Sequence, residues 1–150
     1  MPTIASAATP LRRVFVACAG LMLSTAAAAA ADVVVRVSGA GSGQGQIGCT
    51  LHREGGAFPG GSGVQALWVA AAPGGATCRF RDVQPGAYAV SAFHDENGNR
   101  RLDTNLVGIP TERWGVSNNA RPRFRAPNFA EARIEVGRGP ATNVGLTLQP

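Results

Sequence analysis

The strongest constraint on this chain is a two-residue alternation of apolar and polar side chains that glycine and proline interrupt every few residues. Val33, Val35 and Val37 lie on one parity, and Ile134 and Val136 repeat the pattern near the other end of the chain. Such a period places alternate side chains on opposite faces of a β-strand. The chain holds 20 Gly and 10 Pro among 150 residues and only 15% charged residues, a composition that excludes a coiled coil or a long-helix bundle. The sequence therefore predicts an all-β fold.

Strand patterns recur along the chain, and no segment sustains a period of 3.6 residues. The segments are 33–38, 46–53, 64–70, 76–82, 87–93, 131–136 and 143–148, with glycine-rich turns between them. About seven short strands at this spacing favour two packed sheets. We expect an Ig-like or transthyretin-like two-sheet sandwich, formed as a single domain by residues 32–150.

The N-terminal segment 1–31 has the pattern of a secretory signal peptide. Two arginines precede the apolar run 14–23, and Ala29 and Ala31 satisfy the small-residue rule for cleavage. An uncleaved anchor is the alternative, since the apolar and small residues 14–31 approach the length that spans a bilayer. We predict cleavage, a periplasmic or secreted location and no transmembrane segment afterwards. The net charge then falls from +5 to about +3, which is too small to indicate nucleic-acid binding.

Two cysteines remain after cleavage, because Cys18 leaves with the signal peptide. Cys49 and Cys78 lie on the apolar parity of their strands, so both can point into one core. In an exported protein this pattern predicts a disulfide, which would contribute roughly 3–4 kcal/mol by restricting the unfolded chain. A redox or catalytic pair is the alternative, but the Cys-x-x-Cys spacing is absent.

The segment 95–130 is the longest stretch without a convincing strand pattern, although 111–116 could add one short strand. A connection of this length is uncommon in a compact domain and is often functional. We expect it to be ordered and packed, with Trp114, Phe124 and Phe129 as its anchors.

Oxygen-bearing side chains recur at calcium-loop spacing in residues 95–103. The predicted ligands are the side chains of Asp95, Asn97, Asn99 and Asp103, with the backbone carbonyl of Arg101. An EF-hand loop has glycine where Arg100 stands and glutamate where Leu106 stands, so another carboxylate such as Glu112 would have to complete the set. The alternative is a metal-free turn whose side chains bond their own backbone.

Two further clusters are candidate surface sites. His94 follows a strand, and with Asp95, Asp103 or Glu112 it could perform acid–base chemistry in a small hydrolase-like enzyme. The nucleophile-elbow pattern Gly-x-Ser-x-Gly is absent, and two histidines are too few for a zinc site without the cysteines.

The second cluster is an arginine repeat. Arg121, Arg123 and Arg125 would share one face of an extended segment. Guanidinium groups bind phosphate or a carboxylate-bearing polymer such as a polysaccharide. The alternative is a solvated basic edge without a ligand.

The chain resembles a bacterial exported family known as domain of unknown function 2141. The resemblance rests on Phe-x-x-Val-x-Pro-Gly-x-Tyr-Ala-Val at 80–90, Phe-His-Asp-Glu-Asn-Gly-Asn at 93–99, Leu-Asp-Thr-Asn at 102–105, Gly-Ile-Pro-Thr-Glu at 108–112, Ser-Asn-Asn at 117–119 and Pro-Asn-Phe-Ala-Glu-Ala at 127–132. It extends over about 33–149 and implies a small exported β-sandwich, with no activity attached. The family pattern has a second glycine where Arg100 stands, and if that position needs a positive φ, arginine costs about 1 kcal/mol there.

Three functions follow from these patterns. The first is an exported, non-catalytic module of unknown ligand, whose segment 95–130 presents the binding surface and is stabilised by calcium in one interpretation. The second is the hydrolase-like enzyme that uses His94. The third is a purely structural component of the cell envelope. A cleft that gathers His94, Asp103 and Glu112 would favour the enzyme, and a loop satisfied by its own backbone would favour the structural role.

Overall fold

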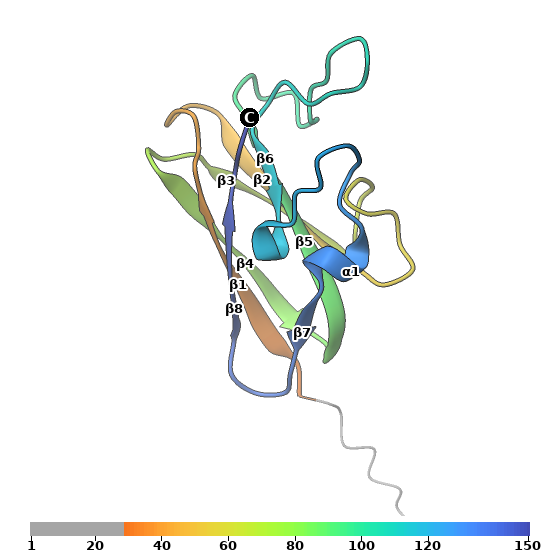
Figure 1. The fold of residues 1–150 in the computed structure, drawn as a ribbon. Helices are drawn as coiled ribbons and strands as arrows, with labels where there is room; N and C mark the ends of the chain where they lie inside the picture. Colours follow the sequence, from red (N-terminus) through yellow and green to blue (C-terminus); the bar gives the residue numbers. More distant parts are fainter. Residues whose placement is uncertain (1–28) are drawn as a thin grey trace, which may run out of the picture.

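The computed structural model describes residues 29–150 (Figure 1), so the predicted signal peptide lies almost entirely outside the described residues. The described residues form two sheets and two short helical turns. The elements are β1 (Ala31–Ser38), β2 (Gln46–Arg53), β3 (Gln65–Ala70), β4 (Gly75–Val83), β5 (Gly86–Asp95), β6 (Trp114–Val116), η1 (Ser117–Asn119), α1 (Phe129–Ala132), β7 (Ile134–Val136) and β8 (Thr142–Thr147). This arrangement confirms the predicted all-β sandwich.

The two sheets face each other across one core (Figure 1). Sheet A has the order β4-β1-β8, and sheet B has the order β3-β2-β5-β6, with β7 also paired to β5. The pairing of β1 with β8 is parallel, and the other strand pairs are antiparallel. The long β2–β5 ladder forms the centre of sheet B and fixes which residues face outward.

Most strand ends lie within one or two residues of the prediction, and the largest loss from a predicted strand is near the C-terminus. The alternation over 131–136 predicted a strand, but only Ile134–Val136 forms one, because Phe129–Ala132 makes a helical turn. Asn128 accepts a hydrogen bond from the backbone N–H of Glu131, whose carboxylate accepts one from the Asn128 N–H in return. This capping box satisfies the free N–H groups of a helix start, so it outweighs the alternating pattern.

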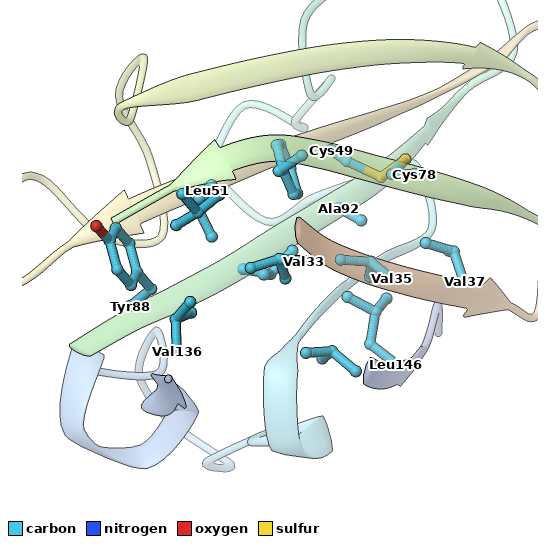
Figure 2. Packing of buried hydrophobic residues seen from close by; sticks show 14 of the residues in the cluster. Val33, Val35, Val37, Cys49, Leu51, Cys78, Tyr88, Ala92, Val136 and Leu146 are labelled. Atoms are coloured by element: carbon cyan, nitrogen blue, oxygen red, sulfur yellow. A yellow bond between two sulfur atoms is a disulfide. The ribbon is translucent and has the colours of Figure 1, made fainter. Parts of the chain in front are cut away.

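The core between the sheets is built from the apolar parity of the strands (Figure 2). Val33, Val35 and Val37 of β1 point from sheet A toward Leu51 and Ala92 of sheet B, and all are nearly inaccessible to solvent. Cys49 and Cys78 form the predicted disulfide, with an S–S distance of 2.06 Å. Because β2 and β4 belong to different sheets, this bond ties the two layers together.

A second, smaller cluster covers part of the outward face of sheet B. Ala89, Val116 and Ala132 are buried there beneath the half-buried rings of Phe58 and Phe129. The cover therefore comes from the 54–63 connection and from α1, which lie beside β5 in Figure 1. The remainder of this face, toward the end of β5, has no such cover. None of the helices within residues 29–150 has the length and apolar character that crossing a membrane requires.

Candidate functional site

Asp95 ends β5 and organises the loop that follows it. Its side chain is fully buried. One carboxylate oxygen accepts hydrogen bonds from the N–H groups of Gly98 and Asn99, at 2.8 and 3.1 Å, and the other accepts one from Arg100 at 2.8 Å. Three backbone donors satisfy a buried carboxylate well, because charge-assisted bonds offset the loss of hydration.

The other predicted calcium ligands are also engaged within the loop. The side-chain oxygens of Asn97 and Asn99 accept the N–H groups of residues 99 and 101, at 3.0 and 2.8 Å. Their amide N–H groups point toward Asp103 and donate to its carboxylate at 2.6 to 3.0 Å. The two asparagine side chains therefore turn N–H groups, and not oxygen atoms, toward the Asp103 carboxylate. Within residues 29–150, no group of three or more His, Cys, Asp or Glu side chains is placed to hold a metal ion.

Arg100 occupies the loop position at which the resemblance described above implies glycine. Its φ is +59°, so the position does require the left-handed conformation. The guanidinium lies over the ring of Trp68, 5.7 Å from its centroid. This contact offsets part of the backbone cost.

Glu112 closes the loop from its far side, where its carboxylate accepts the N–H of Asp103 at 3.1 Å. Desolvation by burial is the main cause that raises the pKa of Glu112. The carboxylates of Asp103 and Asp95 add to the rise, although backbone hydrogen bonds oppose it. Glu112 is therefore a neighbour of the loop carboxylates, and it shares no hydrogen bond with His94 in the described structure.

His94 is buried and uses both ring nitrogens on the segment before β2. Nδ1 accepts the N–H of Gly41 at 3.2 Å, and Nε2 donates to the carbonyl of Gln44 at 2.8 Å. The Glu96 carboxylate lies 3.5 Å from Nδ1. Because both ring nitrogens are hydrogen-bonded to the backbone, the geometry favours a role for His94 in fixing the 39–45 turn. The predicted acid–base group of His94, Asp103 and Glu112 is not brought together by these contacts.

The second histidine has a comparable hydrogen-bonded position. His52 lies on the outward face of β2, where Nε2 accepts the Ser91 hydroxyl at 2.8 Å and Nδ1 donates to the Ala57 carbonyl at 3.1 Å. The ring of Phe58 packs edge-on against it, with 5.2 Å between centroids. Burial lowers the pKa of His52, and the hydrogen bond to Ala57 opposes that shift only partly. The sequence feature that points to this structural role is the place of His52 among the polar positions of its strand.

The three alternating arginines share one hollow, although their partners differ. Arg121 lies over the Trp114 ring, 5.1 Å from its centroid, and donates to the C-terminal residues Gln149 and Pro150. Arg125 forms a bidentate pair with Glu131 at 2.6 and 2.8 Å. This pair raises the pKa of Arg125 and lowers that of Glu131 to about 2. The side chain of Arg123 makes no hydrogen bond or ion pair with the described residues.

Two adjoining hollows form a groove over the uncovered part of sheet B. Their volumes are roughly 590 and 380 Å³. They share Pro59, Leu102, Gly108, Pro110 and Trp114. The groove is therefore bounded by the 54–63 connection, by the loop after β5 and by residues 121–126. Thr50, Ser91 and Phe93 form its floor on the strands.

The groove is rich in arginine. Arg100, Arg101, Arg121, Arg123 and Arg125 line it, together with Phe93, Trp114, Phe124 and four prolines. No aspartate or glutamate is found among the described residues that line it. Two of its walls come from the segment 95–130, and the third comes from the distant 54–63 connection, which the sequence patterns did not link to that segment.

The three aromatic residues predicted as anchors divide into two groups. Trp114 and Phe129 pack against the outer cluster, as expected. Phe124 is 97% exposed, so that prediction is wrong for this ring. The Arg125–Glu131 pair holds the neighbouring residue, and the Phe124 ring lies at the rim of the groove.

A protein-family model matches most of the described chain. The model of an uncharacterised protein conserved in bacteria, DUF2141, matches residues 35–144. Neither the curated proteins nor the solved structures gave a match. The matched region extends from β1 to β8 and includes both sheets, the Asp95 loop and the groove. The chain therefore belongs to the DUF2141 family of uncharacterised bacterial proteins, as its sequence motifs predicted.

Proposed function

We propose that residues 32–150 form an exported, non-catalytic binding module that holds a carboxylate-bearing polysaccharide in the groove over sheet B. The observation that carries this proposal is the lining of the groove, which combines five arginines and several aromatic rings with no acidic side chain among the described residues. Apolar pockets with a few placed polar groups are the usual form of a ligand site.

The arrangement of the arginines suits a row of carboxylates. Arg121 lies over the Trp114 ring and donates to Gln149 and Pro150, so its positive charge is held in one place at the groove. Arg123 makes no ion pair within the described residues, so no internal bond has to break before it binds a ligand. Arg101 supports the opposite wall. Because arginine recognises planar carboxylates in a bidentate manner, this wall-to-wall arrangement favours an acidic polymer over a neutral one.

We propose further that the Asp95 loop supports this groove without calcium. The side-chain oxygens of Asp95, Asn97 and Asn99 already accept backbone N–H groups, and both asparagine amides donate to Asp103. These contacts favour the metal-free turn over the calcium loop, and they place Arg100 and Arg101 at the groove.

Export agrees with the disulfide. A bond between Cys49 and Cys78 is stable in an oxidising compartment and uncommon in the cytosol. This supports a periplasmic or secreted location, in which the module would meet envelope polysaccharides.

The test is binding of oligogalacturonate, with neutral dextran oligomers as the uncharged comparison, measured by isothermal titration calorimetry. We expect binding of the uronate only. Arg123→Glu should weaken it ten- to a hundredfold, because a hydrogen bond to a charged group contributes about 1.5–3 kcal/mol. Arg36→Glu makes the same charge change on an exposed position of β1 in sheet A and should have little effect. Equal losses in the two variants, or equal binding of dextran, would contradict the proposal.

A further inference from the structure

We infer that the loop tip formed by residues 105–109 docks the protein onto an anionic lipid membrane. This tip, called the apolar tip below, carries Leu106, Val107 and Ile109. The inference rests on the shape and exposure of this tip, and it shares Arg121 and Arg123 with the groove of the proposed polysaccharide site.

The apolar tip has a defined, hydrogen-bonded shape. The Asn105 side-chain oxygen accepts the N–H groups of Val107 and Ile109 at 3.1 and 3.0 Å. The backbone of Asn105 also donates to the Ile109 carbonyl at 2.8 Å and accepts the N–H of Gly108 at 2.9 Å. An Asx-type turn of this kind fixes the direction of the side chains that it carries.

That shape turns the aliphatic side chains outward. Leu106 is 106% exposed, Val107 78% and Ile109 59%, so all three side chains face the solvent. Figure 1 shows that the loop after β5 projects past the ends of the strands of sheet B. Large aliphatic residues gathered on a projecting turn indicate a partner surface, because an isolated exposed leucine is ordinary but a cluster is not.

The surroundings of the apolar tip favour an anionic bilayer. Ile109 lies at the edge of the hollow that Arg121 and Arg123 also line, and the exposed ring of Phe124 lies at the same hollow. The carboxylates that flank the tip in the sequence, Asp103 and Glu112, are engaged within the loop, since Asp103 accepts a side-chain N–H of Asn97 and Glu112 accepts the backbone N–H of Asp103.

Exposed aliphatic side chains next to arginines are what a protein needs to bind at the surface of an anionic membrane. Apolar side chains enter the boundary of the acyl chains, and nearby arginines interact with lipid phosphates. A projecting tip fits a surface that yields around it. A rigid protein partner would need a matching cleft.

The experiment is co-sedimentation of the disulfide-bonded chain, recovered from the exported fraction, with vesicles. One set contains phosphatidylglycerol and phosphatidylcholine, and the other contains phosphatidylcholine alone. All variants carry the same N-terminus, so any contribution from residues 1–31 is common to them. The test variant is Leu106→Ser with Val107→Ser, whose side chains are exposed and whose loss should not affect folding. Val64→Ser is the control. Val64 is also an exposed aliphatic residue, at 53%, and it lies just before β3, beside the C-terminal end of β2.

We expect the wild-type chain and Val64→Ser to bind the anionic vesicles with similar affinity. The affinity of the double variant should be lower by about tenfold or more. Binding should fall at 0.5 M salt and be much weaker to phosphatidylcholine alone, since the arginines act through lipid charge. The double variant should still bind oligogalacturonate, so the two proposals can fail separately.

Three results would overturn the inference. The first is no sedimentation of the wild-type chain with anionic vesicles. The second is equal sedimentation of the wild-type chain and the double variant. The third is self-association that the double variant abolishes, measured by analytical ultracentrifugation without lipid, which would assign the apolar tip to a second copy of the chain.

Discussion

At the scale of single residues, Arg100 shows how backbone conformation and side-chain contacts compete. Its φ of +59° is unfavourable for a residue with a Cβ atom by about 1 kcal/mol. Its guanidinium over Trp68 recovers about 0.5–1 kcal/mol, as is typical of an exposed cation–π contact. The departure from the family's glycine is therefore nearly neutral in free energy, and it supplies one of the cations of the groove.

This balance predicts the order of two variants. Arg100→Ala and Arg100→Gly both lose the Trp68 contact, so their difference reports the backbone alone. We expect the glycine variant to be more stable than the alanine variant by about 1 kcal/mol in urea unfolding. At the neighbouring Arg101, whose φ is not positive, the order should reverse because glycine loses more entropy on folding. An alanine variant at position 100 that matches or exceeds the glycine variant would show that the left-handed conformation is not maintained.

At the scale of elements, the Asp95 loop depends on a single carboxylate with three backbone donors. Asp95→Asn would replace one oxygen by an NH₂ group that faces an N–H donor. We expect a loss of about 1.5–3 kcal/mol in the free energy of unfolding. Asp82→Asn is the matched control, since Asp82 is exposed and asparagine tolerates its φ of +53°. The control should change stability by less than about 0.5 kcal/mol.

The same loop gives a prediction about metal. Thermal unfolding of the wild-type chain in EDTA and in millimolar calcium should give one midpoint, because the loop oxygens are already hydrogen-bonded. A folded-state ligand at 100 times its Kd would add about 2.7 kcal/mol, which moves the midpoint of a domain this size by several degrees. A calcium-dependent rise of that size, absent in Asp103→Ala, would restore the calcium interpretation of residues 95–103.

The strands of this fold could be predicted from the sequence, whereas the helical turn α1 and the groove could not. The two-residue period predicted the strands because each has one face on the core, as Val33, Val35 and Val37 do. It missed α1, where the capping pair Asn128 and Glu131 acts locally against the period. The groove was beyond such patterns, because its three walls meet only after β2, β5 and β6 pair. The arginine repeat was visible, but its shared hollow depended on that pairing.

At the scale of the whole molecule, the disulfide is the covalent link between the two sheets. Cys49 and Cys78 are separated by 29 residues in the sequence. Closing a loop of this length restricts the unfolded chain by roughly 3–4 kcal/mol in the chain-entropy model. Typical domains have total stabilities of only about 5–15 kcal/mol, so this one bond is a large share of what holds the layers together.

Cys49→Ala with Cys78→Ala should therefore lower the free energy of unfolding by roughly 3–4 kcal/mol. The urea dependence should steepen slightly, since an unlinked chain exposes more surface when it unfolds. The oxidised wild-type chain treated with a thiol-alkylating reagent is the control, and it should not change because both sulfurs are bonded and buried. A loss below about 1 kcal/mol would mean that the core alone holds the sheets together, and the fold would then be equally stable in a reducing compartment. A loss of the expected size would make the stability of the sandwich depend on an oxidising one, which is the physical link between this fold and its predicted export.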